Sequence, residues 1–132
     1  MRRYLELRPA AYIPRHVHIA GSLTKRYEAE MRDEIGVTKL MWGADYPHLE
    51  GAVPVHREVL RHVFSEMPVD DVRAMLGGNA MELWDFDKIA LQEAADKHGP
   101  TVSEVAAPLS LADFPETFSW SLARPVPLSA PI

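Results

Sequence analysis

The chain has 132 residues, 47% of them hydrophobic, which suggests one domain or less and is enough for a buried core. Its net charge of −5 offers no basic surplus for nucleic acid, and the absence of cysteine excludes disulfides, cysteine-ligated zinc and thiol nucleophiles. No apolar run approaches the ~18 residues of a membrane span, and residues 1–8 lack the apolar core of a signal peptide, so we expect a cytoplasmic protein.

The first half of the chain predicts a strand, a helix and a second strand. Residues 15–20 alternate polar and apolar side chains, which is typical of a short strand. Residues 24–35 have helical apolar spacing and are followed by Gly36, which predicts an amphipathic helix with a glycine C-cap. The predicted buried face of that helix consists of Tyr27, Met31 and Ile35. Residues 39–43 contain a Leu-Met-Trp run that predicts a strand buried on both faces.

The second half predicts helices followed by a tail. Prolines, glycines and capping residues separate four predicted helices: residues 55–66, 69–76, 79–84 and 87–98. We expect the pair Gly77-Gly78 to end the second helix and Asn79 to cap the third. Five of the eleven prolines lie between residues 108 and 131. This composition predicts an ordered domain over residues 1–106 and an extended, loosely attached tail over 107–132.

The order strand, helix, strand predicts a parallel pair joined by a right-handed crossover. Two parallel strands do not make a finished sheet, because both edges and both faces need to be covered. The pattern therefore predicts an α/β fold in which this chain forms the end of a larger domain.

Asp45 is the main candidate for chemistry. It follows the second predicted strand directly, and a carboxylate at the carboxyl end of a parallel strand is well placed for catalysis or metal binding. An aspartate before Tyr-Pro is also typical of a turn, so a purely structural role stays open. His48 lies in the same loop, where it could shape a substrate pocket, bind Asp45 or simply face solvent.

Two segments together resemble a known family. Residues 41–51 read MWGADYPHLEG, and residues 76–87 read LGGNAMELWDFD. The combination resembles the C-terminal end of amidohydrolase-related proteins, the metal-dependent hydrolase branch that includes aminocarboxymuconate-semialdehyde decarboxylase. The resemblance implies a (β/α)8 TIM barrel, with residues 15–20 and 40–43 as its last two strands. Such barrels need about 250 residues, so this chain would hold about the last quarter of one.

The resemblance also implies a chemistry for Asp45. The matching family aspartate binds a catalytic divalent metal, expected to be zinc, and accepts a proton from the attacking water. The reaction would be hydrolysis of a C–N or ester bond, or nonoxidative decarboxylation of a small carboxylic acid. His16 and His18 have the spacing of the family's His-x-His pair, but they fall near the seventh strand instead of the first. We therefore interpret them as polar strand residues.

The remaining family histidines have no counterpart in this chain, and one carboxylate holds a metal weakly. We therefore expect the isolated chain to be inactive and to bind metal poorly. Two alternatives stay open. A separately encoded N-terminal segment could complete the barrel, which would make this chain a subunit. The chain could instead be a non-catalytic module that self-associates.

Overall fold

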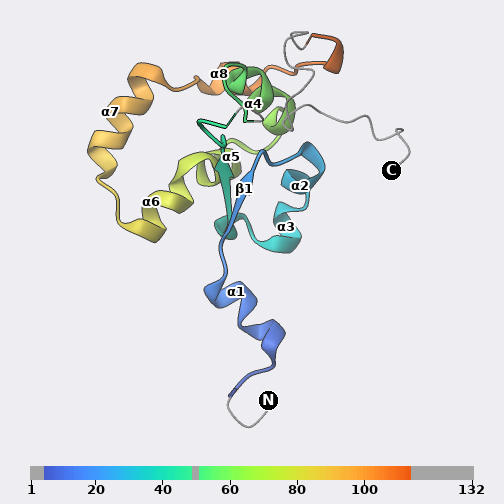
Figure 1. Cartoon of the computed structure of the whole chain (residues 1–132), viewed down its shortest axis with the longest axis vertical. Helices are drawn as coiled ribbons and strands as arrows, with labels where there is room; N and C mark the ends of the chain where they lie inside the picture. Colours follow the sequence, from blue (N-terminus) through green and yellow to red (C-terminus); the bar gives the residue numbers. More distant parts are fainter. Residues whose placement is uncertain (1–4, 49–50, 114–132) are drawn as a thin grey trace.

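A computed structural model describes residues 5–48 and 51–113, and these form a mixed helix and strand structure around a two-stranded parallel sheet. Strands β1 (Ile19–Ser22) and β2 (Leu40–Gly43) pair in register from Ile19 opposite Leu40 to Ser22 opposite Gly43. Two short helices and a 3-10 turn connect them: α2 (Arg26–Glu30), α3 (Arg32–Ile35) and η2 (Val37–Lys39). Figure 1 shows α2 and α3 on one side of the strands and α6 (Asn79–Trp84) on the other. The predicted α/β class and the parallel pair are confirmed.

The first strand lies further along the chain than the sequence predicts. Residues that precede it form the turn η1 (Pro9–Ala11) and the short helix α1 (Ile13–His16), so the prediction of a strand over residues 15–20 is wrong at its start. Pro14 explains the difference, because proline is well suited to the first turn of a helix. The backbone N–H of Val17 donates to the carbonyl of Ile13 and closes this single turn.

The predicted helix over residues 24–35 is broken at Met31, whose ψ of 4° separates α2 from α3. Gly36 ends α3 with φ of 104°, as the glycine C-cap prediction requires. The predicted buried face is wrong for Tyr27 and Met31, which are 55% and 44% exposed, whereas Ala29 is fully buried. On the same helix, the guanidinium of Arg26 donates to the carbonyl of His62 in helix α4 (His56–Phe64) and to Oγ of Ser65, which follows that helix, so α2 is anchored to α4 through Arg26.

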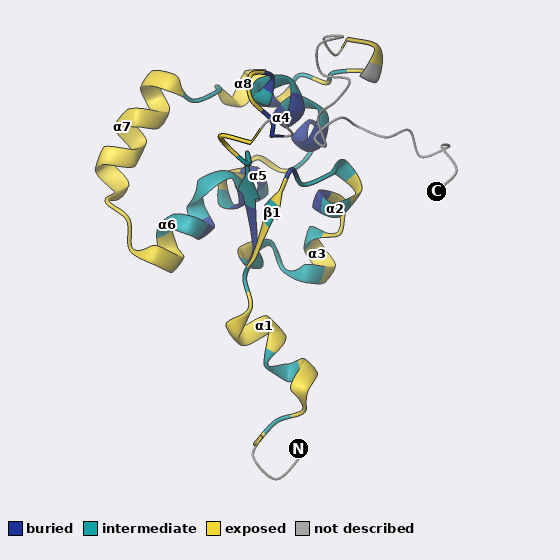
Figure 2. Ribbon diagram, in the orientation of Figure 1, coloured by how far each residue is buried: buried dark blue, intermediate teal, exposed yellow. Residues whose placement is uncertain are grey.

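Helix α4 (His56–Phe64) contributes four side chains to the buried core, and its prediction is confirmed. Its buried side chains are those expected from the sequence: Val59, Leu60, Val63 and Phe64. The ring of Trp42 meets the ring of Phe64 edge-on, with centroids 5.8 Å apart. Leu40 and Met41 of β2 are also buried, which confirms the second strand and its burial. Figure 2 shows this buried centre inside an exposed periphery.

The glycine pair does not end a helix. Helix α5 (Val69–Arg73) runs through a π-helical turn, η3 (Ala74–Gly78), into α6 (Asn79–Trp84). Asn79 itself has helical backbone angles and is buried, so the prediction that it caps α6 is wrong. Its side-chain Nδ2 donates instead to the carbonyls of Val37 and Leu40, each at 2.7 Å, and ties this helical segment to the start of β2.

Helix α7 (Lys88–His98) confirms the last predicted helix. Asp87 caps it by accepting from the N–H groups of Ile89 and Ala90. No residue of α7 is buried, and Figures 1 and 2 show it as an exposed helix standing apart from the sheet. No helix in the described part of the chain is long and apolar enough to cross a membrane.

The segment after α7 contains a helix that the sequence reasoning missed, α8 (Val102–Ala106). Thr101 and Glu104 form a reciprocal capping box at its start, and Val105 packs into the core beside α4. Within the predicted tail, the structure describes residues 107–113, including the turn η4 (Leu111–Asp113). The rest of that prediction lies outside the described residues.

Candidate functional site

The carboxyl ends of β1 and β2 form one edge of the sheet, and both strands leave it by an unusual backbone turn. The N–H of Leu23 donates to the carbonyl of Gly43 at 2.9 Å, which holds the two exits together. Leu23 has φ of 62° and Asp45 has φ of 56°, both in the left-handed region that non-glycine residues seldom adopt. Backbone of this kind persists where the surrounding structure holds it, and it is frequent at functional sites.

Asp45 lies two residues after the end of β2, at the position predicted from the sequence, and its side chain is half-buried. Within residues 5–48 and 51–113, its carboxylate has no hydrogen bond or ion pair. The turn that follows uses its backbone instead, because the N–H of His48 donates to the Asp45 carbonyl at 2.9 Å. In the described part of the chain, the carboxylate is therefore open to a ligand.

Gly51 holds the Asp45 loop closed, a role that the sequence reasoning did not assign. Its N–H donates to the carbonyl of His48, and the N–H of Ala52 donates to the carbonyl of Ala44. A Cβ at Gly51 would lie only 2.8 Å from the Asp45 carbonyl and 2.9 Å from those of Ala44 and His48. Only glycine fits here without moving the backbone that carries Asp45.

His48 is exposed on the same loop and reaches no side-chain partner among the described residues. Tyr46 is 75% exposed beside it. The structure thus brings His48 onto the rim near Asp45, as predicted, but shows no contact between the carboxylate and the imidazole. Its assignment as a substrate-pocket residue stays a prediction.

Lys25 is a further charged residue close to this edge. It follows the end of β1 and begins α2, where its backbone N–H donates to the carboxylate of Glu28. Burial lowers the pKa of the Lys25 ammonium group, and the charge of Glu28 partly opposes that shift. The predicted first strand ends at residue 20, two residues before the end of β1, so the sequence did not single out Lys25 at this edge.

His16 and His18 lie at the other end of the sheet. The ring of His16 stacks on Tyr12 with centroids 6.0 Å apart, and Nε2 of His18 lies 3.4 Å from Nζ of Lys39. Both histidines precede β1, whereas Asp45 follows β2. The four residues of a strand separate the two ends by roughly 13 Å, too far for ligands of one ion.

The donor set at the rim does not fit a catalytic divalent metal. Such sites use three or more protein ligands. In the described ranges, no three histidine, aspartate or glutamate side chains are grouped so that they could hold a metal ion. Asp45 is a single potential ligand, so a metal centre at this edge needs ligands from outside the described residues.

Comparison with known proteins gives one match. A family model described as amidohydrolase matches residues 8–86, which is more than half of the chain. Neither a curated protein nor a solved structure matches.

Proposed function

Because the chain belongs to the amidohydrolase family of metal-dependent hydrolases, we propose that it is the C-terminal part of a (β/α)8 barrel enzyme. The observation that carries this proposal is the position of Asp45, with an unpartnered carboxylate in the described structure, just beyond the carboxyl end of a buried parallel strand. Barrel enzymes of this kind gather their catalytic groups at that end of the strands.

In the completed barrel, Asp45 would be one ligand of a divalent metal, with zinc the expected ion, and a proton acceptor for water. The likeness of residues 41–51 and 76–87 to the aminocarboxymuconate-semialdehyde decarboxylase branch supports either hydrolysis or nonoxidative decarboxylation of a small substrate. His48 would face that substrate from the same rim. The remaining ligands would come from outside this chain, so the chain alone would be inactive.

Calorimetric titration of the pure chain with zinc tests whether metal binding needs ligands from outside this chain. We expect no tight binding, and no difference between the wild type, Asp45→Ala and the control Asp33→Ala, an exposed carboxylate on α3. Sub-micromolar binding that Asp45→Ala abolishes and Asp33→Ala retains would contradict the proposal, because the chain would then hold a sufficient donor set by itself.

The open edge of β1 favours a second candidate function, a subunit that completes its barrel with another chain. In the described residues β1 pairs only with β2, and Ile19 on it is 42% exposed. An exposed strand edge offers unpaired N–H and C=O groups to a further strand. Co-expression with the segment encoded immediately upstream would be expected to yield a complex that binds zinc and loses it on Asp45→Ala. A chain that stays a soluble monomer in that mixture argues against this candidate.

A further inference from the structure

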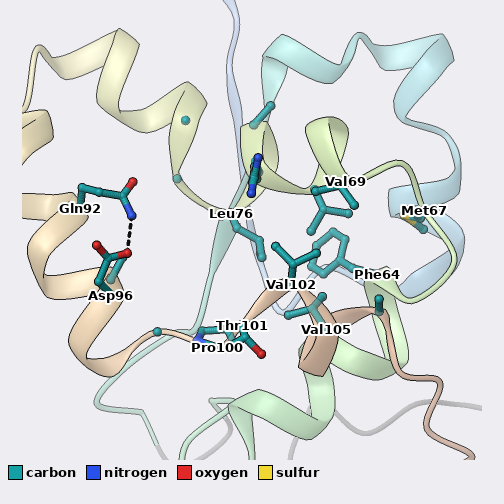
Figure 3. Close-up of a pocket in the computed structure, with 18 of the residues that line it drawn as sticks. Phe64, Met67, Val69, Leu76, Gln92, Asp96, Pro100, Thr101, Val102 and Val105 are labelled. Atoms are coloured by element: carbon teal, nitrogen blue, oxygen red, sulfur yellow. Dashed lines mark hydrogen bonds between the residues drawn. The ribbon is translucent and has the colours of Figure 1, made fainter.

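A cleft of about 810 Å³ opens between α7 and the helices α5, α6 and α8. Part of its apolar lining is accessible, since Val69 and Val102 are 41% and 46% exposed and Leu76 and Met81 are partly exposed. Figure 3 shows Val69, Leu76 and Val102 across the cleft from α7. The volume lies within the ~300–1,000 Å³ typical of ligand pockets, so the cleft has room for large side chains.

The turn between α6 and α7 presents two aromatic side chains to solvent. Trp84 and Phe86 are 56% and 48% exposed, and their ring centroids lie 6.2 Å apart. Neither ring lines the cleft of its own chain. Aromatic side chains, tryptophan above all, are enriched at the centres of protein interfaces. Residues 84–86, the aromatic turn, are therefore a candidate contact surface.

Helix α7 joins the aromatic turn to the cleft, and none of its residues is buried. Isolated helices shorter than about 12–15 residues are marginal in water, so this helix gains stability from a packed neighbour. The amidohydrolase match ends at residue 86, before α7 begins. The aromatic turn precedes α7, whereas Ala95 and Asp96 of its C-terminal half line the cleft. Two antiparallel α7 helices related by a two-fold axis would therefore bring the turn of each copy to the cleft of the other.

The two surfaces also carry complementary charges. Among the described residues that line the cleft, Arg73 is the cation, and its exposed side chain has no hydrogen bond or ion pair in that part of the chain. The anion of the lining, Asp96, accepts from Nε2 of Gln92 at 2.7 Å. Asp85 lies between the two aromatic residues, is exposed, and likewise lacks a partner among the described residues. A carboxylate that enters the cleft with the two rings can pair with Arg73.

The accessible aromatic surface suits a reversible dimer. An aromatic side chain buries about 150–250 Å² when fully covered, so each of these half-exposed rings offers roughly 100 Å². The rings of two copies and the walls that receive them lose roughly 800 Å² of apolar surface together. Interfaces are roughly 60% apolar, which puts the whole contact at about 1,300 Å², near the lower end of specific interfaces. We therefore expect dissociation in the micromolar range.

We propose that a second copy of the chain covers this cleft. The aromatic turn of each copy inserts into the cleft of the other, where Asp85 pairs with Arg73 of the other copy. Such a contact closes after two copies, because the same pair of surfaces is used twice. The proposal is independent of the amidohydrolase chemistry and of the open edge of β1, because neither the Asp45 rim nor β1 lines the cleft.

Sedimentation velocity of the pure full chain across micromolar concentrations tests the proposal. We expect a monomer–dimer equilibrium for the wild type. Trp84→Ser should weaken dimerisation by about a hundredfold or more, because the contact uses this side chain twice. Tyr27→Ser is the matched control, since Tyr27 is 55% exposed on α2 and does not line the cleft. It should leave the dissociation constant unchanged, and far-UV circular dichroism checks that both variants stay folded.

A charge exchange tests how the two copies are oriented. Arg73→Asp and Asp85→Arg should each weaken dimerisation about tenfold, and their combination should restore it because the ion pair re-forms with its charges reversed. Asp85→Asn is a milder variant that should act in the same direction, since asparagine also tolerates the left-handed backbone at this position, where φ is 50°. Arg15→Asp is the control, because Arg15 is exposed on α1 and does not line the cleft.

A chain that stays monomeric at every concentration would overturn the proposal. A dimer that resists Trp84→Ser but is lost on Ile19→Lys would also overturn it, because the copies would then pair at the open edge of β1. Assemblies that grow beyond a dimer would show head-to-tail insertion instead of the reciprocal contact. A double charge variant no tighter than the single ones would refute the pairing of Asp85 with Arg73.

Discussion

The side chain of Asn79 provides the sharpest test of the fold that supports the Asp45 rim. Asn79→Ala removes two hydrogen bonds, those donated by Nδ2 to the carbonyls of Val37 and Leu40. A buried carbonyl left without a donor costs about 1–3 kcal/mol. The Leu40 bond is buried and the Val37 bond is partly buried, so we expect a loss of about 3 kcal/mol in the free energy of unfolding. Domains of this kind have a total of only about 5–15 kcal/mol.

Asn79→Asp distinguishes this role from the helix cap that the sequence suggests. Aspartate caps helices about as well as asparagine, so a capping role predicts almost unchanged stability. A carboxylate has no N–H to donate and would face two carbonyl oxygens, so the structure predicts a loss at least as large as that of Asn79→Ala. Urea unfolding at pH 7, followed by circular dichroism and tryptophan fluorescence, measures both variants. Wild-type stability of Asn79→Asp would refute the reasoning.

Three further changes test other parts of the structure. Gly51→Ala places a methyl group against the Asp45 carbonyl and should cost about 1–3 kcal/mol in thermal unfolding; a neutral result would contradict the tight loop. Phe64→Ala should cost about 3–5 kcal/mol in urea unfolding, whereas a loss below 1 kcal/mol would mean that Phe64 is not central to the core. Hydrogen bonds from the backbone and side chain of Thr101, aided by Arg57, lower the pKa of Glu104. Its stabilising effect is therefore present above the ordinary glutamate pKa and is lost as the pH falls through the lowered value. Glu104→Gln should weaken the dependence of Tm on acid pH, and an unchanged pH profile would show that the capping box contributes nothing.

Local sequence patterns predicted the elements whose apolar side chains form a continuous run or recur at helical spacing. The Leu-Met-Trp run gave β2, and the apolar face of residues 55–66 gave α4 with its four buried side chains. Patterns failed where a single residue or a distant contact decided the outcome. Pro14 lies in the first turn of α1, within the predicted first strand, and Tyr27 is exposed on a helix that Arg26 anchors to α4.

The candidate site also combines features that the sequence predicts with features that only the fold shows. The place of Asp45 after a parallel strand follows from the sequence, and so does the presence of His48 on its loop. The left-handed turns at Leu23 and Asp45 and the tight fit of Gly51 do not, because they depend on contacts between loops that close only in the folded chain.

The sequence by itself determined the α/β class, the parallel strand pair and the membership of the amidohydrolase family, because these rest on periodic burial and on short motifs within continuous segments. Only the tertiary structure showed that Asn79 supports β2 instead of capping a helix, and that His16 and His18 lie at the opposite end of the sheet from Asp45. The reason is physical: a side chain's role depends on which donors, acceptors and apolar surfaces the rest of the fold brings to it, and these come from residues far away in the sequence.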